Sequence, residues 1–105
     1  MFTVVWLVKK RVDLNQEAFI RYWIDEHTSL TASVPGIRAY RCYPMIAHDG
    51  VAPAFDAIAF ASFDDEAAWR IAEQSDEFQA AIADAVNFQT VSETQAFYSA
   101  EHVII

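Results

Sequence analysis

Three polar side chains have the types and positions needed for proton transfer: His27, Tyr40 and Asp56. His27 lies on the apolar stripe of a predicted helix, because at about 100° per residue its side chain falls within roughly 40° of Trp23. An imidazole that faces the protein interior is either hydrogen-bonded in the core or placed to do chemistry. Its ordinary pKa of about 6.5 suits a general base at neutral pH. His27 is therefore the first candidate catalytic residue; alternatively, it is a core residue bonded to backbone or to Glu26.

Tyr40 and Asp56 each have a catalytic and a plainer interpretation. The Tyr40 phenol could donate a hydrogen bond to a developing enolate or oxyanion, or it could belong to an amphipathic strand residue with a satisfied hydroxyl. Asp56 could orient His27 if it points inward, whereas at the mouth of its strand it would be an ordinary exposed acid. We expect a flat ligand to contact three aromatic side chains, those of Trp23, Trp6 and Phe60.

The sequence offers little for metal, nucleotide or thiolate chemistry. The possible metal ligands lie far apart without paired spacing: His27, Cys42, His48 and His102. No glycine-rich phosphate loop is present, and the chain has only two glycines. Cys42 is the one candidate nucleophile, and a cysteine inside a strand is more often an inert small hydrophobe. We therefore expect no metal and no bound cofactor.

Composition limits the class of protein and its partners. A chain of 105 residues with 54% hydrophobic side chains predicts a single domain over residues 1–105. The formal net charge of −8 disfavours nucleic acid, which needs a basic face. No apolar run is long enough to cross a membrane. One cysteine and the absence of a leader-like N-terminus predict a cytoplasmic location.

Hydrophobic periodicity and turn signals predict six elements in the order β-α-β-β-α-β. Asn15 is the expected cap of the first helix, Pro35 and Gly36 end it, and Ser75 is expected to cap a second piece of the later helical region. This order predicts a ferredoxin-like α+β fold, with a four-stranded antiparallel sheet and the helices on one face. The expected elements are strands at 2–8, 37–46, 55–63 and 92–104, and helical regions at 15–33 and 67–87.

Both faces of the predicted sheet are apolar, although the helices can cover only one. The first strand carries Trp6 and Val8 on one face, and Val5 and Leu7 on the other. An antiparallel sheet with one wet face should instead alternate apolar and polar residues. A second copy of the chain is the simplest cover for the other face. We therefore expect a homodimer in which two sheets form a dimeric α/β barrel.

Four groups of residues have a pattern that points to a known family. They are Phe19-x3-Trp23-x3-His27-x2-Leu30, Pro35-Gly36-Ile37-x2-Tyr40, Asp56 with the strand 58–63, and Glu101-His102-Val103. In these motifs, and over nearly its whole length, the sequence resembles the EthD family. The resemblance implies a dimeric α+β barrel and a context of ethyl tert-butyl ether degradation beside an oxidative enzyme system.

A related family, the methylmuconolactone methylisomerases, is similar in its helix histidine and strand tyrosine, which match His27 and Tyr40. That similarity implies a pocket between helices and sheet, but this sequence has no evident second catalytic histidine. The main hypothesis is a catabolic enzyme that moves protons on an aromatic-derived or lactone-like compound, by isomerisation, dehydration or cyclisation. The alternative is a non-catalytic protein that binds a small apolar ligand for an oxidative, ether-degrading system. A cofactor-independent monooxygenase is a weaker possibility, because the first strand has Trp6 but no asparagine.

Overall fold

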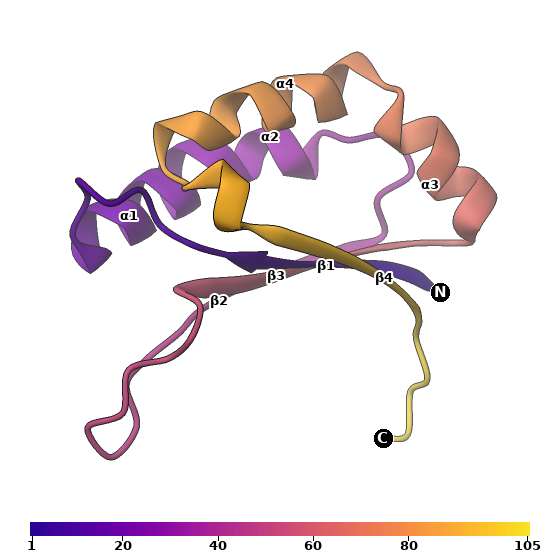
Figure 1. Cartoon of the computed structure of the whole chain (residues 1–105). Coiled ribbons are helices and arrows are strands. Elements are labelled where there is room, and N and C mark those ends of the chain that lie inside the picture. The colour runs from indigo at the N-terminus through magenta and orange to yellow at the C-terminus, as the bar shows by residue number, and fades with distance from the viewer.

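The computed structural model describes residues 1–105 and places the helices over one face of a single sheet (Figure 1). The four strands are antiparallel, in the order β2-β3-β1-β4. This topology confirms the predicted ferredoxin-like α+β fold. The strands are β1 (Phe2–Val8), β2 (Ala39–Pro44), β3 (Ala57–Phe63) and β4 (Gln95–Ala100). The helices are α1 (Gln16–Tyr22), α2 (Thr28–Ala32), α3 (Glu66–Glu73) and α4 (Asp76–Asp84), with short helical turns η1 (Trp23–His27), η2 (Ala85–Asn87) and η3 (Val91–Glu93).

The core lies between the helices and the inner sheet face. Val4 of β1 pairs with Ala61 of β3, and Trp6 pairs with Ala59. The alanines of β3 are buried but small, so the sheet leaves space beneath the helices where larger side chains are absent.

The first helical region begins and ends where the sequence predicts, but its middle is not α-helical. The Asn15 side chain accepts a hydrogen bond from the Ala18 N–H at 2.8 Å, and the chain turns at Gly36 with a φ of +79°, a conformation that favours glycine. Between these ends, η1 is a π-helical turn that joins α1 to α2. Residues within a π-turn have ordinary helical propensity, so the sequence predicted a regular helix here.

The last strand is shorter than expected. We expected it to cover residues 92–104, but residues 91–93 form the turn η3 and β4 ends at Ala100. The physical reason is the length of its only partner, since β4 pairs with β1 alone. The last main-chain contact joins the Glu101 N–H to the Met1 carbonyl at 2.9 Å, and beyond it no strand remains to pair with.

The helical region after β3 is divided as predicted. The Ser75 side chain accepts from the Phe78 N–H at 3.1 Å and caps α4, which separates it from α3. The loop between β2 and β3 and the C-terminal segment extend on the side of the sheet opposite the helices (Figure 1). No helix has the length and apolar character needed to cross a membrane.

Candidate functional site

A cavity of about 200 Å³ lies between the inner sheet face and the helices. Of its fifteen lining residues, eleven are hydrophobic. The lining contains no lysine, arginine, aspartate or glutamate. Its members are Trp6, Val8, Trp23, His27, Thr31, Tyr40, Ala59, Phe78, Ala81, Ile82, Ala85, Gln89, Val91, Thr94 and Ala96.

The π-turn η1 contributes two of these residues. Trp23 and His27 are its first and last members, and Thr31 follows four residues later. All three are buried, with exposed fractions of 1%, 7% and 6%. Since residues four apart lie on the same face of a helix, these three side chains reach the same cavity. π-Turns occur frequently at functional sites.

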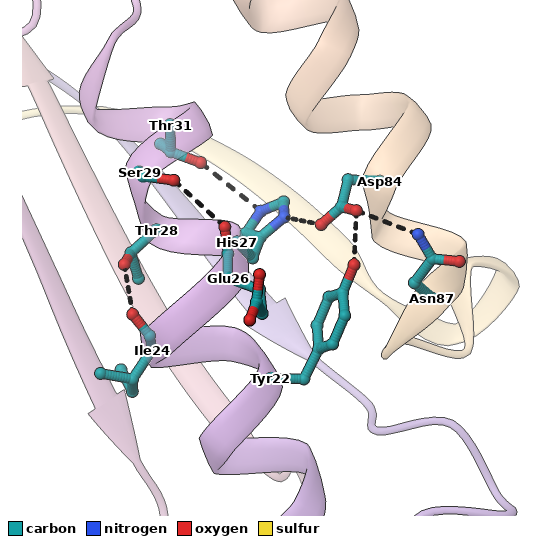
Figure 2. Close-up of polar contacts among 9 residues, drawn as sticks. All are labelled: Tyr22, Ile24, Glu26, His27, Thr28, Ser29, Thr31, Asp84 and Asn87. Atoms are coloured by element: carbon teal, nitrogen blue, oxygen red, sulfur yellow. Dashed lines mark hydrogen bonds and ion pairs between the residues drawn. The ribbon is translucent and has the colours of Figure 1, made fainter.

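His27 is fixed from α4 by a carboxylate that the sequence analysis missed. Its Nδ1 lies 2.9 Å from Oδ2 of Asp84 (Figure 2). The ring of Phe88 packs against the imidazole with 4.5 Å between centroids. The imidazole is therefore held both by a hydrogen bond and by an aromatic contact.

Asp84 itself receives hydrogen bonds from two further donors. Oη of Tyr22 donates to its Oδ1 at 2.6 Å, and Nδ2 of Asn87 donates to the same oxygen at 3.0 Å (Figure 2). Burial raises the pKa of Asp84, but the hydrogen bonds from Tyr22, His27 and Asn87 outweigh it, so that the pKa lies below its ordinary value. Asp84 is thus an ionised acceptor at neutral pH.

Burial lowers the pKa of His27, although Asp84 acts in the opposite direction. The imidazole is therefore neutral at pH 7. Because the ionised Asp84 can only accept, Nδ1 carries the proton and the acceptor lone pair lies on Nε2. The Thr31 Oγ1 lies 3.5 Å from Nε2, at the long limit of a hydrogen bond. Nε2 is thus the less satisfied of the two ring nitrogens.

Tyr40 of β2 also lines the cavity. Burial is the main cause that raises the pKa of its phenol well above the ordinary value, while contacts with Thr31 and Trp23 act to lower it. Tyr40 therefore stays protonated and can donate a hydrogen bond. Burial also raises the pKa of the neighbouring Cys42 thiol, which makes Cys42 a poor nucleophile at neutral pH.

The structure brings together four of the six residues named from the sequence. His27, Tyr40, Trp23 and Trp6 line the cavity, whereas Asp56 and Phe60 do not.

Asp56 lies at the mouth of its strand, where its carboxylate accepts from the Lys10 N–H at 2.8 Å. The carboxylate that contacts His27 belongs to Asp84, so the proposed orienting role of Asp56 has to be corrected. Phe60 must also be removed from the predicted ligand contacts of this cavity. Its position in β3 alternates with Ala59 and Ala61, so it faces the side opposite the helices, edge-on to Tyr43 with 5.5 Å between ring centroids.

The spacing of Asp84 from apolar residues in the sequence indicates that its side chain faces the core. Asp84 follows Ala81 by three residues and precedes Phe88 by four, and both neighbours are buried. It is therefore an acid on an apolar stripe, the same pattern that identified His27. Thr31 follows the same spacing from His27. Gln89 and Thr94 lie outside regular helix, where periodicity gives no signal.

Metal-binding geometry is absent from the structure. No three side chains of histidine, cysteine, aspartate or glutamate are grouped so that they could hold a metal ion.

Fold and site together define a class of protein: an α+β ferredoxin-like domain with a mainly apolar cavity, lined by a buried histidine that is bonded to a carboxylate behind it. Residues 11–92 match the EthD domain family. The chain therefore belongs to the EthD family. Among curated proteins, none is significantly similar to this chain in sequence.

Solved structures agree on the fold. An EthD family protein from Bacillus halodurans superposes with a TM-score of 0.85 at 20% identity, over 97% of this chain and 99% of that one. A dimeric ferredoxin-like protein of unknown function from Thermobifida fusca gives 0.70 at 19%, over 95% and 90%. A DABB family protein with a ferredoxin-like fold from Mesorhizobium loti gives 0.69 at 12%, over 97% of each chain.

Proposed function

We propose that this protein is a small-molecule enzyme that catalyses proton transfer on an aromatic-derived or lactone-like compound. Isomerisation, dehydration and cyclisation all belong to this class. The observation that carries the proposal is His27, which is neutral, bonded to Asp84 through Nδ1, and lines an apolar cavity together with Tyr40. A base oriented by a carboxylate, with a nearby donor, is an arrangement that general acid–base catalysis uses.

In this mechanism Nε2 of His27 accepts a proton from an acidic C–H or O–H group of the bound compound. The resulting imidazolium is stabilised by the ionised Asp84, which stays deprotonated. Tyr40 donates a hydrogen bond to the oxygen where negative charge develops. His27 then returns the proton to another atom of the same compound, so that no net proton is gained or lost.

The proposal is tested with deuterium exchange into 2-indanone, a flat ketone with acidic C–H groups, followed by proton NMR near pH 7.5. The wild type should accelerate exchange over buffer, and His27→Gln should reduce the acceleration by about 10²–10⁴-fold. His48→Gln is the matched control, because His48 is exposed. Equal rates for wild type and His27→Gln would contradict a catalytic His27.

The alternative function is ligand binding without catalysis, in support of an oxidative, ether-degrading system. The apolar character of the lining favours it, since eleven of fifteen residues are hydrophobic. A cofactor-independent monooxygenase is a weaker candidate. Trp6, Trp23 and His27 do line the cavity, but no asparagine is among the lining residues. Exchange that depends on His27 would favour the enzyme over both.

We also infer that the functional unit is a homodimer. The outer sheet face, opposite the helices, carries apolar side chains from four strands, and exposed apolar patches of this kind mark interaction sites. A solved structure with the same fold from Thermobifida fusca is dimeric. The side chains concerned are those of Val5, Leu7, Tyr43, Ile58, Phe60 and Phe97.

A further inference from the structure

We propose that the cavity selects uncharged, ring-sized ligands that donate a hydrogen bond, such as phenols and enols, and that it rejects carboxylates. This inference rests on the proposed function, because it names the class of compound that the same site takes. It is carried by three features: the absence of lysine and arginine from the lining, the lone pair on Nε2 of His27, which has only a long contact with Thr31, and the size of the cavity.

The charge distribution disfavours an anion. Lysine and arginine are absent from the residues that line the cavity. Two cations directly follow lining residues in the chain, Lys9 and Arg41. Nζ of Lys9 bonds to the Ala54 carbonyl, and Arg41 alternates with Tyr40 in β2, so its side chain lies on the sheet face opposite the cavity. The charged group closest to the imidazole is the Asp84 carboxylate, which is negative. A carboxylate in the cavity would thus lose its water without gaining a cation, which is strongly unfavourable.

The hydrogen-bonding groups favour a donor on the ligand. Nδ1 of His27 is occupied by Asp84 at 2.9 Å, whereas Nε2 has only the long 3.5 Å contact with Thr31. A phenol or enol can donate its O–H to this nitrogen. Its oxygen can still accept, and Tyr40, which lines the cavity from the sheet, supplies an O–H that can donate to it. A hydrocarbon of the same shape would leave Nε2 without a strong partner.

The cavity volume of about 200 Å³ suits a ligand of about one substituted ring. Dry apolar cavities of about 150 Å³ can hold a benzene molecule. The aromatic walls of Trp6 and Trp23 suit a flat compound.

The test uses three probes of the same shape: 4-methylphenol, toluene and 4-methylbenzoate. Each is titrated into isotope-labelled wild type at pH 7.5, and binding is followed through the NMR signals of cavity residues. We expect 4-methylphenol to bind about fivefold more tightly than toluene, as one hydrogen bond predicts. Relative to 4-methylbenzoate, we expect a preference of at least about tenfold.

A variant that should gain affinity adds a second test, because a protein that fails to fold could not produce this result. Gln89 lines the cavity and lies outside the catalytic pair. Gln89→Lys should raise the affinity for 4-methylbenzoate at least about tenfold, because it provides the missing cation. The matched variant Gln89→Met, similar in length but uncharged, should not.

The inference is overturned if 4-methylbenzoate binds wild type as tightly as 4-methylphenol, or if none of the probes shifts the signals of cavity residues. These outcomes can be told apart from failure of the proposed function. If the phenol preference holds but 2-indanone exchange is not accelerated, the site is a binding site with this selectivity. If exchange is accelerated but carboxylates bind best, the enzyme acts on acids.

Discussion

His27 and Asp84 affect each other's pKa through the hydrogen bond that joins them, and this bond selects the tautomer of the imidazole. The carboxylate receives three hydrogen bonds, from Tyr22, His27 and Asn87, so it remains ionised and immobile. An ionised and immobile acceptor forces the proton onto Nδ1 and directs the lone pair of Nε2 away from α4. Asp84 is accordingly a positioning residue, since it acts on the ligand through His27.

Replacement of Asp84 by asparagine tests this role. Asp84→Asn removes the charge that raises the pKa of His27, so NMR titration of the imidazole should show a still lower pKa. The rate of 2-indanone exchange should fall at least about tenfold, as when the carboxylate of a catalytic triad is neutralised. Glu77→Gln changes an exposed acid on the same helix and serves as the control. An unchanged His27 titration in Asp84→Asn would contradict the coupling.

The buried imidazole also predicts how stability depends on pH. Burial lowers the pKa of His27 in the folded state, whereas the unfolded chain takes up that proton near pH 6.5. The unfolded state therefore binds more protons as the pH falls below about 6.5, and the free energy of unfolding decreases. The contribution of the neutral His27 to the free energy of unfolding is therefore fully present above about pH 6.5.

Urea denaturation at a series of pH values measures the effect. The loss of stability below about pH 6.5 should be smaller in His27→Gln than in wild type, because the variant has no group to titrate at this position. Asp84, whose pKa is lowered by its partners, adds a separate loss at more acidic pH as its folded-state pKa is passed. Parallel curves for the two proteins between pH 5 and 7 would show that His27 does not titrate as proposed.

Residue patterns and the family resemblance pointed to His27 and Tyr40 but could not supply their partners. His27 stood out because a titratable ring on an apolar stripe is uncommon, and this is a property of local sequence. Its contact with Asp84 joins residues 57 positions apart, and no local pattern encodes which acid meets which histidine. Asp56 was a reasonable candidate by composition, and it failed because the Lys10 N–H takes up its carboxylate.

The elements were predictable to the extent that periodicity and capping determine them. Strands, helix caps and the break at Ser75 follow from local preferences, and the structure has them. The π-turn was not predictable, because it depends on how residues 23–27 pack against the sheet and α4. The length of β4 was also missed, because it is set by the end of β1 rather than by its own residues.

The π-turn has a side-chain support that can be removed. In η1 the Thr28 N–H bonds to the carbonyl of Trp23, five residues back. The Thr28 hydroxyl instead donates to the Ile24 carbonyl at 2.7 Å (Figure 2). This side-chain bond satisfies a carbonyl that the usual main-chain donor four residues later does not reach. We infer that Thr28 stabilises the turn that presents Trp23 and His27 to the cavity.

Thr28→Val keeps the shape of the side chain but removes this hydrogen bond. We expect a loss of about 0.5–1 kcal/mol of stability, which lowers the melting temperature by several degrees, together with altered NMR signals of the His27 ring. Ser33→Ala is the control, because its hydroxyl makes a similar bond to the Leu30 carbonyl at the end of α2. Equal disturbance of the His27 signals in both variants would argue against a specific role of Thr28.

At the scale of the whole molecule, the side of the sheet opposite the helices has the features of an interface. The sheet presents an apolar surface there, and two projecting segments extend from the same side (Figure 1). Both segments carry exposed aliphatic side chains: Ile46 and Val51 in the loop between β2 and β3 are 82% and 69% exposed, and Ile104 near the C-terminus is 88% exposed. A second sheet placed on this face would be flanked by these segments. Stable interfaces bury roughly 800 Å² on each partner.

A charge at the centre of this surface should separate the two copies. Phe60 lies in β3, next to both β1 and β2, and its ring is edge-on to Tyr43. Light scattering of wild type at micromolar concentration should give twice the chain mass of 11.9 kDa, whereas Phe60→Glu should give the mass of one chain, because a carboxylate between two apolar sheets would lose its water, and its cross-strand neighbour Arg41 would have to be buried with it. Ile71→Glu, on the exposed side of α3, is the matched control and should stay dimeric. Circular dichroism confirms that each variant remains folded. A wild type that scatters as a single chain would contradict the dimeric barrel, and it would leave the apolar sheet face without the cover proposed for it.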